Sequence, residues 1–276
     1  MTEFRRSIRH DSPACADTAV TCEIRVLDSV IDLIESYRLR YEVYGALGYL
    51  RRTNASRLEI DEFDPCAIPF GAFDLASGAL IGTLRLITQE PQPVYAALVG
   101  SVIDSLVDPD LADQALAPRQ RALPSIVSPE VETAVAAFNP DGFAVQELSR
   151  TIVRPGHRGG GVSRGLMEFG IAHAARSAPA VLIGSCQAEH VAMYARYGYA
   201  PLALPGPGYF SSVGQVAIAV ACRTDRLPDP TLGHVEGLVR DLQSGVRERV
   251  LEVGRDSRAV FCFAESRRPR RRTLEW

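Results

Sequence analysis

The chain has no lysine, so all 30 of its basic residues are arginine. A nucleotide-binding P-loop ends in Gly-Lys-Ser/Thr, and the missing lysine therefore excludes a site of that type. No apolar run approaches the length of about 18 residues that a membrane span needs, and no signal-peptide pattern is present, so we expect no integral membrane segment and a cytoplasmic protein. The 33 acidic residues leave a net charge of −3, which argues against general nucleic-acid binding.

Cysteine and histidine are few and scattered. The six cysteines show no CxxC spacing, and the five histidines form no cluster with ligand spacing. We therefore expect reduced thiols, no metal and no permanently bound cofactor. Cys186, with His190 four residues later, could form a nucleophilic pair only if the two shared a helix; we expect Cys186 instead to be a buried small apolar residue.

The pattern of apolar residues predicts an α/β fold. Strands are expected at 21–28, in a hairpin over 70–87 that turns at Ser77–Gly78, and at 143–153 and 181–186, with helices between them. Residues 1–19 are expected to be a disordered lead, and residues 20–225 the main domain with a helical insertion at 88–140. Residues 226–276 form an extension, with one or two amphipathic helices over 232–254 and an Arg-rich tail that could contact an acidic carrier protein or anionic lipid.

Residues 143–166, FAVQELSRTIVRPGHRGGGVSRGL, carry the most specific chemistry. An alternating strand enters an arginine- and glycine-rich turn that opens an apolar helix, where free backbone N–H groups could bind a phosphate. Arg158 adds a forked cationic donor. The alternative is a flexible surface turn. The residues expected to bind the anion and the group attached to it are Ile152, Val153, Arg158, Gly159, Gly160, Gly161, Val162 and Ser163.

Further polar residues fall into a short series along the chain. Arg40 and Tyr44 lie four residues apart on a predicted helix, and Glu59, Asp61 and Asp64 follow it. Gly82–Leu86 includes Arg85, and Glu147–Arg150 reads ELSR on the strand before the glycine turn. Strict alternation along that strand would place Glu147 and Ser149 on one face and Leu148 and Arg150 on the other. Tyr194 precedes Gly198, where a predicted helix stops.

The turn, read as R-x-x-G-x-S, resembles the acyl-CoA-binding loop of the GCN5-related N-acyltransferases. The order of elements over about residues 36–200 resembles acyl-homoserine-lactone synthases and the related N-acyl amino acid synthases. Tyr44 and Tyr49 stand where lactone synthases usually carry Phe and Trp, and the loop is better formed than theirs, which favours the amino acid branch. The resemblance implies the GCN5-related fold, with a mixed sheet of about six to seven strands flanked by helices on both faces.

The same resemblance implies a function. A bacterial enzyme of this kind would transfer a long-chain acyl group from acyl-phosphopantetheine, on acyl-carrier protein or CoA, to an amino acid or another small amine. Glu147 would accept the proton of the amine, and Tyr194 would protonate the leaving thiolate. Arg40, Tyr44, Asp61, Asp64, Arg85 and Arg150 would bind substrate or form a structural charge network.

Simpler readings of these residues remain open. Glu147 and Arg150 could belong to a structural ion-pair network with Asp61, Asp64 and Arg85, and Tyr194 could be a packing aromatic. Two other functions also remain. One is an acyl-homoserine-lactone synthase that uses S-adenosylmethionine, and the other is a sensor that binds an acyl carrier or lipid without turnover.

Overall fold

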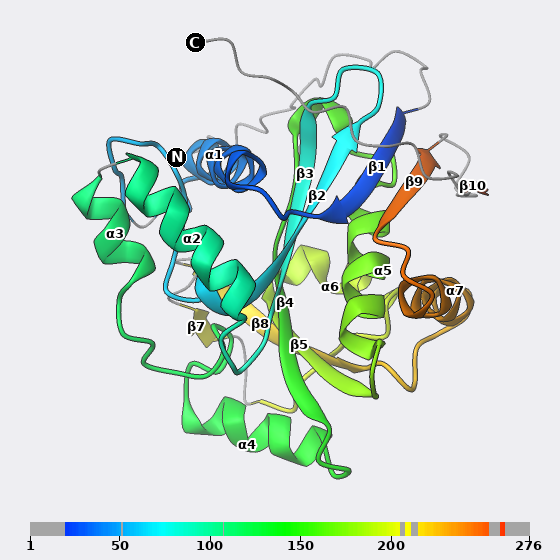
Figure 1. The fold of residues 1–276 in the computed structure, drawn as a ribbon. Coiled ribbons are helices and arrows are strands. Elements are labelled where there is room, and N and C mark those ends of the chain that lie inside the picture. The colour runs from blue at the N-terminus through cyan, green and yellow to red at the C-terminus, as the bar shows by residue number, and fades with distance from the viewer. Residues whose placement is uncertain are drawn as a thin grey trace, which may run out of the picture.

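A single mixed sheet forms the centre of the molecule in the computed structural model, which describes residues 20–50, 52–106, 108–204, 208–210, 215–253 and 260–262. The strand order is β10-β9-β1-β2-β3-β4-β5-β8-β6, and β7 pairs with β8 beside this path (Figure 1). The strands are β1 (Val20–Val26), β2 (Ala67–Asp74), β3 (Leu80–Ile87), β4 (Ala144–Val153), β5 (Ala180–Cys186), β6 (Ala200–Pro201), β7 (Gly208–Phe210), β8 (Gln215–Arg223), β9 (Glu248–Val253) and β10 (Val260–Cys262).

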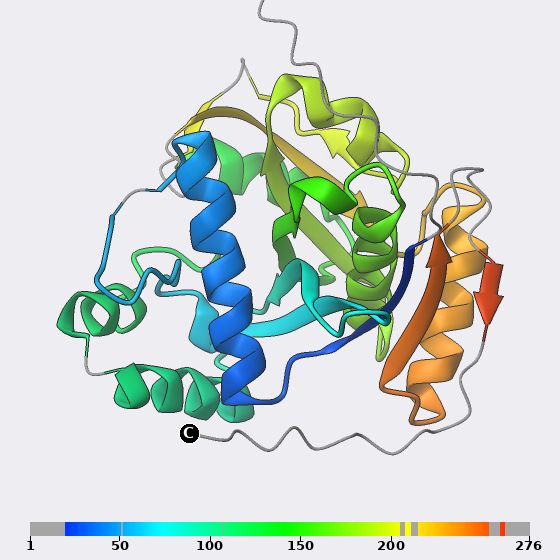
Figure 2. The ribbon, with the colours of Figure 1, turned by 90° about the horizontal axis from the view of Figure 1, so that it is seen from above.

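Helices cover both faces of this sheet, which confirms the predicted α/β class (Figures 1 and 2). They are α1 (Val30–Leu47), α2 (Pro93–Leu106), α3 (Pro109–Ala115), α4 (Pro129–Phe138), α5 (Val162–Ala175), α6 (Val191–Ala195) and α7 (Thr231–Gln243), with 3-10 turns η1 (Asp64–Cys66), η2 (Pro155–His157) and η3 (Ala188–His190). Helices α5 and α7 lie on one face, while α1, α2 and α4 lie on the other.

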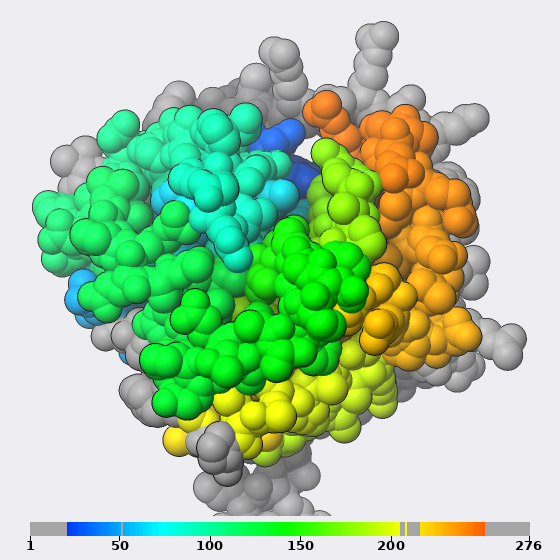
Figure 3. Space-filling view, turned by 90° about the horizontal axis from the view of Figure 1, so that it is seen from below, coloured from blue at the N-terminus to red at the C-terminus, as the bar shows by residue number. Residues whose placement is uncertain are grey.

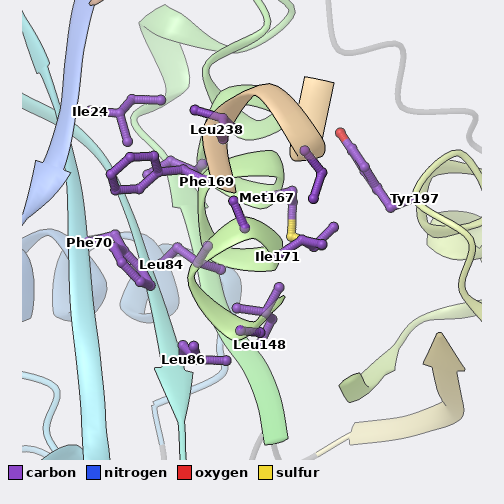
Figure 4. Close-up of a cluster of buried hydrophobic side chains, with 14 of the residues drawn as sticks. Ile24, Phe70, Leu84, Leu86, Leu148, Met167, Phe169, Ile171, Tyr197 and Leu238 are labelled. Carbon is purple, nitrogen blue, oxygen red and sulfur yellow. The ribbon is translucent and has the colours of Figure 1, made fainter. Parts of the chain in front are cut away.

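The core beneath α5 decides which way the strand residues point. Leu84 of β3 and Leu148 of β4 lie in one buried cluster with Phe169 of α5 (Figure 4). The Phe169 ring meets the Phe70 ring edge-on at 5.6 Å between centroids. Because neighbouring residues of a strand point to opposite faces, Arg85 and Glu147 are directed away from α5 and towards the α1, α2 and α4 side.

The insertion between β3 and β4 contains α2, α3 and α4. Ser128 caps α4 by accepting the N–H of Val131, and Pro129 occupies the first turn. Val131 and Val135 of α4 pack into a buried cluster with Ile183 of β5. Figure 3 shows this green segment covering much of the face seen from below, next to the yellow residues around β8. The insertion is therefore part of the core on that face of the sheet.

The C-terminal extension differs from the prediction. Helix α7 ends at Gln243, and Glu248–Val253 forms strand β9, so the expectation of helix over the whole of 232–254 was wrong. Strand β9 pairs antiparallel with β1, and Leu251 packs in the cluster beneath α5, which favours a strand there. The predicted lead at 1–19 and the Arg-rich tail from Arg267 lie outside the described residues. None of the helices in the described part has the length and hydropathy that a bilayer crossing requires.

Candidate functional site

Strands β4 and β5 run side by side and then part. They pair in parallel from Ala144↔Ala180 to Glu147↔Ile183. The paired register ends there, although β4 continues to Val153 and β5 to Cys186. On its other side β4 remains paired with β3 as far as Val153. The far half of β4 therefore presents one edge of its backbone towards the space between the two strands.

A bulge in β4 re-aims one side chain of the ELSR segment. The β3–β4 register changes from Arg85↔Ser149 to Thr83↔Ile152, so that Leu84 faces two residues, Arg150 and Thr151. Arg150 has a φ of 57°, in the left-handed region. The prediction that strict alternation would place Arg150 with Leu148, opposite Glu147 and Ser149, was wrong. The extra residue turns the Arg150 guanidinium to the face that carries Ser149 and Arg85.

Three buried arginines meet three carboxylates on this face. Arg40 forms a two-pronged pair with Asp64, at 2.8 and 3.0 Å, and Arg85 forms one with Asp61, at 2.6 and 2.8 Å. Arg150 donates to Glu59 at 2.7 Å and to Asp61 at 2.8 Å. Burial alone would raise the pKa of Asp61, yet Arg85 and Arg150 hold that pKa well below its usual range. The cluster is therefore charged and internally neutralised at neutral pH.

Glu147 stands beside this cluster with a partner of its own. Its side chain is buried, and both carboxylate oxygens are hydrogen-bonded by Ser125, one by the backbone N–H at 2.8 Å and one by the hydroxyl at 2.9 Å. Burial raises the pKa of Glu147 to about 7, against the opposing effect of the two hydrogen bonds from Ser125. At neutral pH this carboxyl group can therefore both accept and release a proton.

The glycine turn delivers the chain to the start of α5. Gly159 has a φ of 80° and Gly161, the N-cap of α5, a φ of 79°, a backbone region that residues with a Cβ adopt only with strain. The first N–H groups of a helix have no acceptor within it, and the N-cap glycine offers no side chain to satisfy them. Val162 is buried, Ser163 is partly exposed and Arg158 is exposed, so the loop offers backbone and guanidinium donors beside the helix start.

Backbone alternation identifies which amide of β4 faces β5. The N–H of Arg154 donates to the carbonyl of Ile81 on β3. In an antiparallel ladder alternate residues bond to the same neighbour, so Ile152 also bonds towards β3 while Val153 points its N–H and C=O the other way. The Nε of Arg158 donates to the Val153 carbonyl at 3.1 Å, on that same edge. Of Ile152 and Val153, both expected from the sequence to bind the group attached to the anion, only Val153 directs its backbone N–H away from β3 and towards β5.

Tyr194 lies on α6, near Cys186 at the end of β5 and Thr151 on β4. Its ring meets the ring of Tyr199 edge-on at 5.3 Å. Burial, followed by the nearby Cys186, raises the pKa of the Tyr194 phenol above its ordinary value, while a hydrogen bond with Thr151 lowers it less. The phenol therefore keeps its proton at neutral pH.

Burial also raises the pKa of the Cys186 thiol to about 11, which argues against the nucleophilic alternative. Cys186 ends β5 rather than sharing a helix with His190, which is exposed.

Aromatic residues from α1 and the segment after it contact Arg150 of β4 and Gln187 after β5. The guanidinium of Arg150 lies 5.4 Å from the centre of the Tyr44 ring, and the Tyr44 and Tyr49 rings are 6.0 Å apart. Gln187, just after β5, donates to the Tyr49 hydroxyl at 2.5 Å. Tyr49 and Gln187 thus connect the N-terminal half of the chain to the end of β5. In the described part of the chain, no group of three His, Cys, Asp or Glu side chains is arranged to hold a metal ion.

Sequence reasoning missed two of these contacts. Ser125 lies in an irregular stretch of the insertion, where no periodicity or motif marks it, and only the fold brings it to Glu147. The Tyr49–Gln187 contact joins residues 138 positions apart.

The three acids Glu59, Asp61 and Asp64 were recognisable from their spacing. In the structure each pairs with one of the arginines, as Asp64–Arg40, Asp61–Arg85 and Glu59–Arg150. In the part of the chain that the structure describes, Glu147 forms no hydrogen bond or ion pair with these acids and arginines, whereas Arg150 belongs to the cluster.

Comparison with known proteins finds one matching family. Residues 35–222 match the family described as N-acyl amino acid synthase FeeM. FeeM from uncultured soil microbes is 19% identical over 74% of this chain and 91% of its own, with a TM-score of 0.46. BjaI, a CoA-dependent acyl-homoserine lactone synthase solved with SAM and isopentyl-CoA, is 17% identical over 81% of this chain and 90% of its own, with a TM-score of 0.47. Escherichia coli ElaA is 14% identical over 74% of this chain and 99% of its own, with a TM-score of 0.40. No curated protein sequence matches the chain.

Proposed function

The chain belongs to the family of N-acyl amino acid synthases, and from this premise we propose that it transfers a long-chain acyl group from a phosphopantetheine thioester to the amine of an amino acid or a similar small amine. Family membership makes the protein an N-acyltransferase. The carrier protein or CoA as donor, the acyl length and the acceptor are parts of the proposal. Its main support is the separation of β4 from β5 between the start of α5 and Glu147.

The donor would enter along the open edge of β4. Its phosphate would accept hydrogen bonds from the N–H groups at the start of α5, with Arg158 beside them. The pantetheine arm would lie between β4 and β5 and pair with the exposed backbone edge. The N–H of Val153 points into this space and would polarise the thioester carbonyl, stabilising the negative charge that develops on its oxygen.

The acceptor would arrive as an ammonium ion and must lose a proton before it attacks. Glu147 is suited to take that proton because its pKa of about 7 leaves part of it ionised at neutral pH. The amine nitrogen would then bond to the carbonyl carbon as the carbon–sulfur bond breaks. Tyr194 would give its proton to the leaving thiolate and recover one from the attacking nitrogen, which loses its second proton through water, while Glu147 returns the proton that it accepted to solvent. The amide product and a free thiol complete the balance.

The charged cluster would serve mainly to hold this framework. Three arginines and three carboxylates neutralise one another, so no net charge in the cluster is left over for a substrate carboxylate. Tyr44, over the Arg150 guanidinium, would instead offer an aromatic wall next to the acceptor. We therefore propose a positioning role for Arg40, Asp61, Asp64, Arg85 and Arg150.

An assay with paired variants tests this proposal. Wild-type protein is mixed with acyl-CoA or acyl-carrier protein of several chain lengths and with candidate amines, and thiol release and product mass are measured. Glu147→Gln should lower kcat by about 100-fold or more with little change in the KM for donor, because general-base assistance is lost. Arg158→Ala should raise the donor KM instead, because a phosphate contact is lost.

The same assay separates the alternatives. Release of methylthioadenosine when S-adenosylmethionine is added would favour a lactone synthase. Tight donor binding without thiol release from any donor would favour a sensor. Full activity in Glu147→Gln would contradict the assignment of the base.

A further inference from the structure

The insertion reaches the candidate active site at one residue, Ser125. Residues 116–128 join α3 to α4, and Ser125 in this segment is 1% exposed. Its backbone N–H donates to Oε2 of Glu147 at 2.8 Å, and its hydroxyl donates to Oε1 at 2.9 Å. The two residues lie 22 positions apart. One residue of the insertion thus contacts both oxygens of the carboxylate on β4.

The backbone around Ser125 is itself fixed. The N–H of Ile126 donates to the Leu123 carbonyl, and the N–H of Val127 donates to the Ser125 carbonyl, each at 3.1 Å. Leu123 is fully buried in the cluster that contains Ile183 of β5. The donors of Ser125 are therefore anchored to the same core that positions the end of the β4–β5 pairing, which limits the orientations open to the Glu147 carboxylate.

The two donors favour one protonation state. A backbone N–H can only donate, so it stabilises a carboxylate oxygen and would gain nothing from a carboxyl O–H in the same place. Each oxygen of the Glu147 carboxylate retains a lone pair that can take a proton from the amine substrate. The other charged or titratable groups near Glu147 are Arg85 on β3, Arg150 on β4, and the phenols of Tyr194 and Tyr199 around α6. These remain in place when the Ser125 hydroxyl is removed.

We infer that Ser125 is a positioning residue of this enzyme, which bonds both oxygens of Glu147 and holds it in the ionised form that proton acceptance from an amine requires. The inference rests on the proposed role of Glu147 as the base. Ser125 acts through Glu147 and contacts no reacting atom. It also gives the insertion a function in catalysis, since the segment supplies the partner of the base.

Ser125→Ala tests the inference because it removes the hydroxyl donor and keeps the backbone N–H. The folded-state pKa of Glu147 should rise, so the acid limb of kcat against pH should move upward by about one pH unit. Below the limb, kcat should fall about tenfold, and at alkaline pH it should return to the wild-type value. The donor KM should not change. Ser125→Thr, which restores a hydroxyl, should recover the wild-type limb.

Ser101→Ala is the matched control. Its hydroxyl is exposed on α2 in the same insertion and donates to the Ala97 carbonyl one helical turn away. It should leave the pH profile unchanged. An equal loss of kcat at every pH in Ser125→Ala would overturn the inference, since it would mean that the serine acts only on the fold.

A second measurement does not depend on turnover. The carboxyl infrared band of Glu147 is obtained as the pH-dependent difference between each protein and its Glu147→Gln counterpart. The titration midpoint should be higher in Ser125→Ala than in wild type. An unchanged midpoint in a folded variant overturns the inference, as does a shifted midpoint with an unshifted kcat profile. If the wild type transfers no acyl group to any amine, the proposed function fails. A titration midpoint of Glu147 that still shifts in Ser125→Ala would then show that the effect of Ser125 on Glu147 holds although the proposed function does not.

Discussion

Arginine residues of this protein form ion pairs both in the buried core and at the exposed surface. Arg85 is almost completely buried and bonded to Asp61 and Ser149, whereas Arg154 pairs with Glu42 at 3.3 Å and both side chains are 43% exposed. Water screens the exposed pair, so it contributes little to stability. In the buried cluster each charge depends on its partners, because desolvation leaves nothing else to stabilise it.

Arg85→Met should therefore lower the free energy of unfolding by about 3–5 kcal/mol, because Asp61 is left buried with part of its compensation missing. Arg154→Met should change it by less than about 1 kcal/mol. Urea unfolding followed by circular dichroism measures both. Similar losses in the two variants would contradict the view that burial gives the Arg85 pairs their importance.

The charged residues were also the part of the site most accessible from the sequence. Their motif order identified Arg40, Asp61, Asp64, Arg85 and Arg150 as a set, and the fold gathers them. The partner of Glu147 was not accessible, because Ser125 has an ordinary residue type in an irregular stretch. A sequence motif identifies residues that lie close together along one strand or helix. A contact made by a loop residue forms only when the core has packed, so the sequence pattern does not predict it.

At the scale of elements, the turn between β4 and α5 requires glycine because of its backbone conformation, not because a side chain would lack room. A Cβ added at Gly159 would meet nothing within 4 Å, yet its φ of 80° disfavours any side chain. Gly161 has the same conformation at the N-cap of α5. These glycines therefore set the direction in which the first N–H groups of the helix point.

Gly161→Ala should cost about 1–2 kcal/mol of stability, the penalty for a left-handed residue with a Cβ, and should raise the donor KM as the turn distorts. Gly100→Ala is the control, since Gly100 lies inside α2 with nothing within 4 Å of its added Cβ. It should stabilise by about 0.5–1 kcal/mol and leave the KM unchanged. A normal donor KM in Gly161→Ala would argue against an anion site at this turn.

The sequence predicted these elements well but not their details. Strand β4, the start of α5 and the β2–β3 hairpin follow from apolar periodicity and turn residues. The face of Arg150 did not follow, because a bulge adds one residue to β4 and breaks the two-residue period on which that prediction rested. The bulge is held by tertiary ion pairs, which have no signature in local pattern.

At the scale of the whole molecule, the segment beyond the family match is built into the core. Strand β9 extends the sheet past β1, and Leu251 lies against α5. Amphipathic spacing alone suggested helix here. The free edge of β1 and the apolar surface of α5 select a strand instead, and neither feature is visible from residues 232–254 alone.

A coupled pair of substitutions tests this packing. A Cβ on Gly165 of α5 would come within 2.0 Å of Leu251 Cδ1 and 2.7 Å of Ile24 Cδ1. Gly165→Ala should therefore destabilise by about 1–3 kcal/mol, from overpacking. Leu251→Ala alone should cost about 2–5 kcal/mol, from the cavity it leaves. In the double variant the combined loss should be smaller than the two losses added together, by about 0.5–3 kcal/mol, as measured by denaturant unfolding. Simple additivity would mean that β9 does not pack on α5 as described.

The bulge at Arg150 and Thr151 also determines how β4 tolerates changes in length. Deleting one of these two residues would restore a regular ladder in which Ile152 and Val153 keep their partners on β3. The single residue left opposite Leu84 would then point to the α5 face, so no arginine from β4 would reach Glu59 and Asp61. Single-residue deletions here should therefore lower the free energy of unfolding by about 3–5 kcal/mol, because both carboxylates are left buried with part of their compensation missing. Deletions at the exposed β2–β3 turn around Ser77 should be tolerated far better.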